Sequence, residues 1–231
     1  DTPSLLTIDQ VETMFHEFGH ALHGLLSQCT YRGLSCTNTK RDFVELPSQI
    51  NEHWATEPEV LAVYAKHYQT GEIIPQELVQ KLEESGKYGQ GFATVEYLAA
   101  SLVDMDLHTL TEVPADLNVM EFEQEALKKR GIPRQIFPRY RVTNFSHCMG
   151  GGYTAGYYCY MWSEVLDCDA FEAFKEAGSI YDQETADKFR KFCLAPGGID
   201  EGLVMYKNFR GHDPQIDALL RKRGLSNSAC R

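Results

Sequence analysis

Residues 11–26, VETMFHEFGHALHGLL, carry the pattern from which the fold of this chain is predicted. Apolar side chains recur at spacings of three and four between Ile8 and Leu25, which is the period of an amphipathic helix. Thr7, three residues before Gln10, fits a capping box, in which the hydroxyl accepts an otherwise unpaired backbone N–H. The stretch therefore predicts a helix over residues 8–27.

The rest of the chain shows the same period and predicts a mainly α-helical protein. Helical patterns cover residues 42–57, 58–69, 75–85, 91–111, 118–130, 153–177, 182–193 and 214–223, separated by Gly and Pro signals. Pro47 fits the helix over 42–57 only if it lies in the first turn. Residues 29–41 break the period with Thr, Asn and Gly, which predicts a loop or a short β-hairpin there.

Composition and charge restrict the class of protein. With 231 residues, 43% hydrophobic and 24% charged, the chain is typical of a globular protein. The net charge of −11 argues against a nucleic-acid partner, because phosphates are bound through clustered Lys and Arg. No apolar run approaches the roughly 18 residues of a membrane span, and no signal peptide is visible. Seven cysteines without a CxxC pair favour reduced thiols, so we expect a cytoplasmic protein without a membrane partner.

The motif HEFGH predicts a catalytic metal site. His16 and His20 are four residues apart on one helix face, and Glu17 points to the side of that face. Leu26 stands where the longer HExxHxxGxxH motif requires histidine, so the third ligand must come from elsewhere. Glu45 lies on the next predicted helix, after a loop long enough to turn the chain back. We therefore predict one zinc ion held by His16, His20 and Glu45, with a fourth position open to water and Glu17 as general base.

Three further polar residues lie on these two helices. Glu52 falls two turns after Glu45 on the same face, which makes it a candidate partner for a ligating imidazole N–H, although an exposed helix glutamate would show the same spacing. His23 and His53 have no place in a three-ligand site. We expect them to be packed or surface histidines.

A second segment, HCMGGGYTAGYYCYMWSEV at residues 147–165, is rich in aromatic residues. Tyr153, Tyr157 and Tyr160 share one face at helical spacing, which in most proteins indicates core packing. Beside a hydrolytic zinc, phenols and the imidazole of His147 would instead suit stabilisation of a developing oxyanion. GGGYTA also satisfies a loose GxGxxA pattern, but no alternating strands and helices surround it, which disfavours a dinucleotide site.

Three segments together resemble the signatures of the thimet oligopeptidase family of zinc metallopeptidases. They are FHEFGHALHGLLS, DFVELPSQINEHWA and HCMGGGYTAGYYCYMWSEVL. The phrases NTKRDFVELPSQINEHWATEPEV and PRYR…FSHCMGGGYTAGYY are most similar to its peptidyl-dipeptidase branch. The resemblance implies a multi-helix, zincin-like catalytic lobe with a small β or loop element between the ligand helices. Members are much longer and enclose a channel between two lobes, so residues 1–231 correspond to the C-terminal catalytic portion, without the N-terminal lobe.

The resemblance also implies roles for individual residues. It gives the two histidines of HEFGH and Glu45 to zinc, and Glu17 to proton transfer. It implies that substrate binding and stabilisation of the tetrahedral intermediate fall to His147, Tyr153 and Tyr160, with Tyr157 on the same segment.

One residue departs from the family pattern. The family usually reads LSGT where this sequence has LSCT, so Cys36 replaces a glycine in the loop between the ligands. If that glycine has a positive φ, the loop of this chain must be reshaped or strained.

The predicted function is zinc-dependent hydrolysis of short peptides, releasing dipeptides from the C-terminus. Such an enzyme must bind the terminal carboxylate of its substrate, for which a fork-like guanidinium is suited. Arg139 and Arg141 are the candidates, although salt bridges within this acidic chain would use them equally well. Two alternatives stay open: an endo-acting oligopeptidase with the same site, and a catalytically incompetent zinc-containing fragment that binds peptides.

Overall fold

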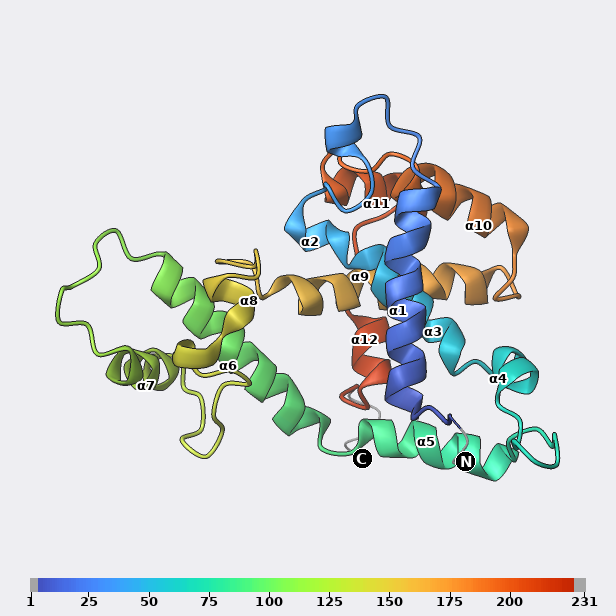
Figure 1. The fold of residues 1–231 in the computed structure, drawn as a ribbon, viewed down its shortest axis with the longest axis horizontal. Coiled ribbons are helices and arrows are strands. Elements are labelled where there is room, and N and C mark those ends of the chain that lie inside the picture. Colours follow the sequence, from blue (N-terminus) through green and yellow to red (C-terminus); the bar gives the residue numbers. More distant parts are fainter. Residues whose placement is uncertain (1–3, 227–231) are drawn as a thin grey trace. The chain divides into compact units, whose positions relative to one another are not determined.

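The computed structural model describes residues 4–226, which contain helices and loops but no β-strand (Figure 1). The described residues divide into two compact units, one of residues 4–88 with 162–226 and the other of residues 89–161. No Gly-, Pro- or Ser-rich linker marks these boundaries in the sequence, and the second of them falls inside a helix. The prediction of a mainly α-helical chain is confirmed.

The helices of each unit follow in chain order. The first unit contains α1 (Ile8–Leu25), the 3-10 helix η1 (Arg32–Leu34), α2 (Arg41–Val44), α3 (Leu46–Ala55), α4 (Pro58–Tyr64), α5 (Gln76–Lys87), most of α9 (Cys159–Glu176), α10 (Gln183–Phe189), the π-helix η3 (Arg190–Leu194), α11 (Gly202–Arg210) and α12 (Asp217–Lys222). The second unit contains α6 (Gln90–His108), α7 (Val119–Lys129), the 3-10 helix η2 (Val142–Asn144), α8 (Ser146–Met149) and the first residues of α9.

The beginning of α1 forms as its sequence predicts. The N–H of Gln10 donates to Thr7 Oγ1 at 3.3 Å, and the N–H of Thr7 donates to Gln10 Oε1 at 2.9 Å. The single helix predicted over 42–57 is wrong, because two helices, α2 and α3, meet at Glu45. Pro47 has no N–H with which to continue the α2 ladder, and it is accommodated in the first turn of α3.

Other sequence predictions also need correction, among them the helix over 58–69, which ends at Tyr64. Residues 29–40 form turns and η1, so the loop alternative holds and the hairpin does not. The helix predicted from residue 153 begins only at Cys159, because Ala155, at a φ of 51°, lies outside the helical region. α11 was not predicted from the sequence.

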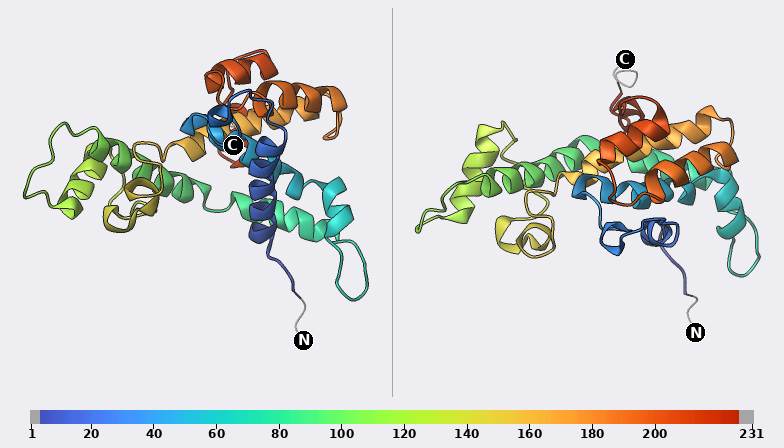
Figure 2. Two further views of the ribbon diagram at one scale, coloured as in Figure 1. Left: turned by 45° about the horizontal axis from the view of Figure 1, so that its top comes forward. Right: turned by 90° about the horizontal axis from the view of Figure 1, so that it is seen from above.

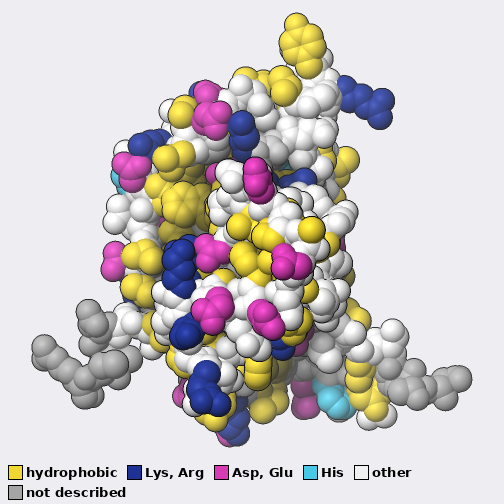
Figure 3. All heavy atoms as spheres, turned by 90° about the vertical axis from the view of Figure 1, so that its left-hand side faces the viewer, with side chains coloured by type: hydrophobic (Ala, Val, Ile, Leu, Met, Phe, Trp, Pro, Cys, Tyr) yellow, Lys and Arg dark blue, Asp and Glu magenta, His cyan; other side chains and the backbone are white. Residues whose placement is uncertain are grey.

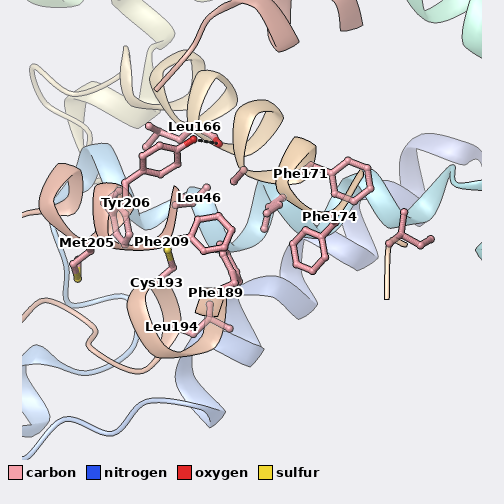
Figure 4. Close-up of a cluster of buried hydrophobic side chains, with 14 residues drawn as sticks. Leu46, Leu166, Phe171, Phe174, Phe189, Cys193, Leu194, Met205, Tyr206 and Phe209 are labelled. Carbon is pink, nitrogen blue, oxygen red and sulfur yellow. Dashed lines mark hydrogen bonds between the residues drawn. The ribbon is translucent and has the colours of Figure 1, made fainter. Parts of the chain in front are cut away.

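The core of the first unit lies between α9 and the helices around it. Figure 4 shows this cluster of buried residues, which are Phe43, Leu46, Ile50, Leu166, Ala170, Phe171, Phe174, Ile180, Phe189, Cys193, Leu194, Met205, Tyr206 and Phe209. In the views of Figures 1 and 2, α10 and α11 lie on the same side of α9. The buried hydroxyl of Tyr206 donates to the carboxylate of Asp169 at 2.5 Å, which satisfies the one polar atom of this aromatic side chain.

α1 and α3 approach closely at Gly19. A Cβ at this position would lie 2.3 Å from the carbonyl oxygen of Pro47 and 2.6 Å from the Cα of Ser48. Backbone atoms cannot yield as a flexible side chain can, so only glycine permits this distance between the two helices. The side chain of Asn51 adds a hydrogen bond from α3 to the carbonyl of Phe15 on α1, at 2.6 Å.

Gly19→Ala is therefore expected to lower the free energy of unfolding of the full-length protein by about 1–3 kcal/mol, because the added methyl group forces the two helices apart. Urea denaturation measures this change. Gly33→Ala is the matched control, since a Cβ at Gly33 meets no atom within 4 Å. Equal stability of the two variants would contradict the close packing at Gly19.

The second unit has an aromatic core of its own. Its buried members are Tyr97, Ala100, Phe145, Cys148 and Tyr157, and a smaller apolar cluster joins α6 to α7.

On the face drawn in Figure 3, acidic and basic side chains are interspersed among hydrophobic ones. None of the helices within residues 4–226 combines the length and apolar character that a membrane span requires.

Candidate functional site

The structure brings together the three predicted zinc ligands, all of which belong to the first unit. His16 and His20 occupy successive turns of α1, and Glu45, 2% exposed, lies at the junction of α2 and α3. Glu45 Oε2 is 3.4 Å from His16 Nε2 and 3.2 Å from His20 Nε2. Tetrahedral zinc, with bonds of roughly 2.0–2.1 Å, separates its donor atoms by about 3.3 Å. Two imidazoles and a carboxylate at this spacing fit a zinc ion.

Local structure holds the Glu45 carboxylate in place. The hydroxyl of Ser48 donates to Glu45 Oε2 at 2.9 Å, and the N–H of Gln49 bonds to the Glu45 carbonyl at 2.9 Å in the first turn of α3. The helix break that Pro47 imposes therefore sets the position of this carboxylate as well as the start of α3.

Glu52 pairs with the outer nitrogen of His16, as the sequence indicated. His16 Nδ1 lies 2.5 Å from Glu52 Oε1, which orients the ring so that Nε2 faces Glu45. Burial lowers the pKa of His16, but its hydrogen bonds with Glu45 and Glu52 raise the pKa by a larger amount. The net result is a pKa of about 9. In the absence of a cation, His16 therefore holds a proton that a bound metal would displace.

The remaining histidines of α1 and α3 differ in environment. His23 is fully buried, and neither ring nitrogen has a hydrogen-bond partner within residues 4–226. Burial and the neighbouring His20 lower the pKa of His23 to about 4, so this ring is neutral and acts as a packed core residue. His53 is half-buried and bonds to Asp167, a contact that the sequence did not predict.

Glu17, the predicted general base, is exposed on α1 directly after His16. Its carboxylate is therefore accessible to water and to an incoming substrate. A group that exchanges protons with water must be accessible to water, and the exposed Glu17 meets this requirement.

His147, Tyr153 and Tyr160 form an aromatic group in the second unit. The rings of Tyr153 and Tyr160 stack at 5.1 Å between centroids, and the His147 ring lies 5.9 Å from the first and 6.1 Å from the second. Burial and the guanidinium of Arg139 lower the pKa of His147. His147 is therefore a neutral imidazole with one N–H to donate at pH 7.

Asp104 positions the turn that carries these tyrosines, and sequence reasoning missed it. Its buried carboxylate accepts the N–H of Ala155 at 3.0 Å and the N–H of Tyr157 at 3.0 Å. The sequence feature that could have revealed Asp104 is an acidic residue on the apolar face of the helix predicted over residues 91–111, where an apolar side chain is expected. Asp104 thus takes up two backbone N–H groups that the non-helical turn would otherwise leave unpaired.

The other predicted substrate residues have different surroundings. Tyr157 is 2% exposed and stacks on Tyr97 at 4.8 Å, so its ring packs in the core of the second unit. Arg141 Nε is 2.5 Å from the buried Glu123, which is the salt-bridge alternative considered from the sequence. Arg139 is exposed, with its guanidinium 5.7 Å from the centroid of the Tyr140 ring.

Comparison with known proteins places the chain in a family. Residues 1–225 match the model described as peptidase family M3. The chain belongs to peptidase family M3. The family predicted from the three signature segments is thereby confirmed.

The curated relatives of this M3 chain include dipeptidyl carboxypeptidases and oligopeptidases. It is 45% identical to a dipeptidyl carboxypeptidase of Salmonella typhimurium over 96% of the chain and 33% of the relative, and 46% identical to a dipeptidyl carboxypeptidase of Escherichia coli over 97% and 33%. It is also 40% identical to oligopeptidase A of Escherichia coli, over 96% and 33%. The M3 chain therefore spans about a third of the length of these relatives.

Cys36 shows the strain expected of its position in the inter-ligand loop of this M3 chain. Its φ is 55°, in the left-handed region that residues with a Cβ rarely adopt. Its sulfur is close to α1, because a Cβ at Gly24 would lie 3.0 Å from Cys36 Sγ. The loop therefore keeps a backbone conformation suited to glycine, with a larger side chain in its place.

Cys36→Gly is expected to raise the free energy of unfolding of the full-length protein by about 0.5–1 kcal/mol, since release of the strained φ exceeds the added flexibility of the unfolded chain. Urea denaturation under reducing conditions checks this result. Cys36→Ser, which keeps the Cβ, serves as control and should match the parent. A Cys36→Gly variant less stable than the parent would contradict this account. It would show that the contacts of the Cys36 side chain stabilise the fold by more than the strained φ destabilises it.

Proposed function

We propose that this chain is the C-terminal catalytic portion of a longer zinc-dependent peptidase that acts on short peptides. The observation that carries the proposal is the convergence of His16, His20 and Glu45, whose donor atoms have the spacing that zinc requires. Membership in family M3 and the names of the relatives support peptide hydrolysis. The sequence prediction of a cytoplasmic location stays a prediction.

Proton transfer is assigned to Glu17. When bound, zinc would polarise a substrate carbonyl and lower the pKa of water towards about 7. Glu17 then takes the proton of the attacking water and delivers it to the leaving amine, a role for which its exposure and its place beside His16 suit it. Glu52 keeps the His16 ring oriented throughout, through its hydrogen bond to Nδ1.

Hydrogen-bond donors for the developing oxyanion are assigned to His147 and Tyr160, with Tyr153 stacked beside Tyr160 as a substrate contact. The lowered pKa of His147 supports this role, since a neutral imidazole donates a proton in a hydrogen bond without adding a charge to the ground state. Asp104 holds the preceding turn, so these donors are set in place before substrate binds. Tyr157 supports them from the core.

Release of C-terminal dipeptides is proposed as the mode of cleavage. Identity is higher to the relatives named dipeptidyl carboxypeptidase, at 45% and 46%, than to oligopeptidase A of Escherichia coli, at 40%. Arg139, exposed and next to the aromatic group, is the candidate partner of the substrate carboxylate, whereas Arg141 is bound to Glu123. Endo-acting cleavage is the second candidate. It is favoured by the 40% identity to the relative named oligopeptidase A.

A substrate pair distinguishes the two modes. We expect the full-length protein to cleave a free-acid peptide roughly 10–100-fold faster, in kcat/KM, than its C-terminally amidated form, which is the scale of one charged hydrogen bond. Mass spectrometry of the products identifies the released dipeptide. Arg139→Gln should remove this preference, and Arg134→Gln, a change at a nearby exposed arginine, should not. Equal cleavage of both peptides would overturn the peptidyl-dipeptidase assignment in favour of the oligopeptidase.

The third alternative is a catalytically incompetent zinc-containing fragment that binds peptides. Zinc content and peptide cleavage, measured together, test it. Relatives are about three times as long as the part that this chain matches, so we propose that the remaining portion of the protein completes the substrate channel. Full-length protein that binds stoichiometric zinc yet cleaves no short peptide would support the binding reading and overturn the proposed hydrolysis.

A further inference from the structure

A second group of ligand-type side chains lies in the first unit, separate from the candidate zinc site. His53 on α3 and the consecutive residues Asp167 and Cys168 on α9 place one donor atom each within 4.8 Å of one another. His53 Nε2 is 2.6 Å from Asp167 Oδ1. Asp167 is 1% exposed and Cys168 is 3% exposed, so two of the three donors come from the interior.

The carboxylate of Asp167 interacts with both other members of the group, by hydrogen bonds with His53 and with the Cys168 thiol. Its Oδ1 bonds to His53, and its Oδ2 is buried with no N–H or O–H donor among the described residues, which leaves the weak S–H donor of Cys168. A buried carboxylate oxygen with only a weak donor is unfavourable unless a proton or a cation neutralises it. Burial raises the pKa of Asp167 and of the Cys168 thiol, which is the effect that a bound cation would oppose.

A cavity connects this group to the surroundings. It has a volume of about 570 Å³, and its walls include His53, Cys168 and Phe171, together with the charged side chains Glu57, Lys175 and Lys222. Such a volume admits a hydrated ion and leaves room for a coordinated water. Two of the three donor residues, His53 and Cys168, and several charged side chains line the walls, which distinguishes this cavity from an apolar packing defect.

Lys222 opposes a cation here most strongly, and Lys175 and Arg223 are further cationic groups that act on His53 or Asp167. Burial lowers the pKa of Lys222, but Asp167, Cys168 and Glu164 raise it more, so the side chain is an ammonium. Its Nζ lies 3.8 Å from Glu164 Oε1, a counter-charge that Lys222 shares with Arg223. A divalent cation with one carboxylate and one thiolate forms a neutral unit, so Lys222 keeps its pairing with Glu164 when the site is filled.

We infer that His53, Asp167 and Cys168 form a second metal site, for a divalent cation that accepts a thiolate ligand, such as zinc or cobalt. His53 supplies Nε2, Asp167 a carboxylate oxygen and Cys168 its sulfur, and the fourth position opens to the cavity. Binding releases to solvent the thiol proton of Cys168 and the proton between His53 and Asp167. The 2.6 Å separation of His53 and Asp167 widens to the roughly 3.3 Å of neighbouring tetrahedral ligands.

Cobalt absorption tests this inference independently of peptidase activity. The site of His16, His20 and Glu45 has no sulfur ligand, so a thiolate-to-cobalt charge-transfer band in the near ultraviolet cannot come from that site. The experiment uses metal-free full-length protein carrying Cys29→Ser and Cys36→Ser, which removes the two half-exposed thiols of the described residues. We expect the band to grow on titration with Co²⁺ and to saturate with two cobalt ions bound per chain.

Variants assign the band to its ligands. Cys168→Ser should abolish the band and leave one bound cobalt, whereas Cys193→Ser, a change at another buried cysteine, should keep both. His53→Gln should weaken the band-forming site at least about tenfold, the scale seen when even an outer partner of a ligand is lost, with circular dichroism confirming that each variant is folded. The second site would be overturned if the protein bound a single cobalt ion without the band. It would also be overturned if the band persisted in Cys168→Ser, or if cobalt affinity at the band-forming site were unchanged in His53→Gln.

Discussion

Glu17→Gln in the full-length protein is expected to retain zinc and to lose roughly 10²–10⁴-fold in kcat, the usual contribution of a positioned general base. The amide has the shape of the carboxylate but cannot accept a proton from water. Glu17 is exposed on α1 and is not among the three grouped donors, so its replacement leaves the ligand set intact. Steady-state kinetics, with zinc content measured on the same sample, checks both parts.

Glu12→Gln is the matched control, because Glu12 lies on the same helix and outside the ligand group. Its kcat should equal that of the parent. Retained activity in Glu17→Gln would remove Glu17 from the mechanism. Loss of zinc together with activity would instead make it part of the metal site.

The second large effect is expected at Glu45. Glu45→Gln keeps the size of the side chain but removes the negative charge that faces the Nε2 atoms of His16 and His20. Loss of an outer partner such as Glu52 typically lowers metal affinity roughly 10–100-fold, and loss of a charged ligand exceeds this range. We therefore expect zinc to bind more weakly in Glu45→Gln than in Glu52→Gln, and both to bind more weakly than the parent.

Competition with a chelator of known affinity measures the order of these three proteins. Hydrolysis by Glu45→Gln should return as the zinc concentration is raised, since Glu17 and the aromatic group are untouched. Unchanged zinc affinity in Glu45→Gln would exclude this carboxylate from the site.

Parts of the site follow from local sequence, because they depend on the geometry of single helices. His16 and His20 are one turn apart on α1, and the spacing alone puts them on one face. Glu45 could be predicted as a residue of the next helix. Its place at a helix junction could not, because that follows from how Pro47 enters the first turn of α3.

Other features depend on contacts between distant residues and left no local pattern. Asp104 binds the N–H of Tyr157, 53 positions away in sequence, and His53 binds Asp167, 114 positions away. The helical spacing of the tyrosines was misleading for the same reason. The turn around Ala155 is stabilised by Asp104, so tertiary contact overrides the periodicity of the segment.

Removal and return of zinc tests the central claim most directly. Full-length protein freed of metal by a chelator should not cleave a short free-acid peptide, and one equivalent of zinc should restore cleavage. The same protein with His20→Ala should stay inactive at one equivalent, because it lacks one of the three donors that converge on the site. Cleavage that persists without metal, or that one equivalent of zinc restores equally in His20→Ala, would contradict a zinc peptidase built on His16, His20 and Glu45.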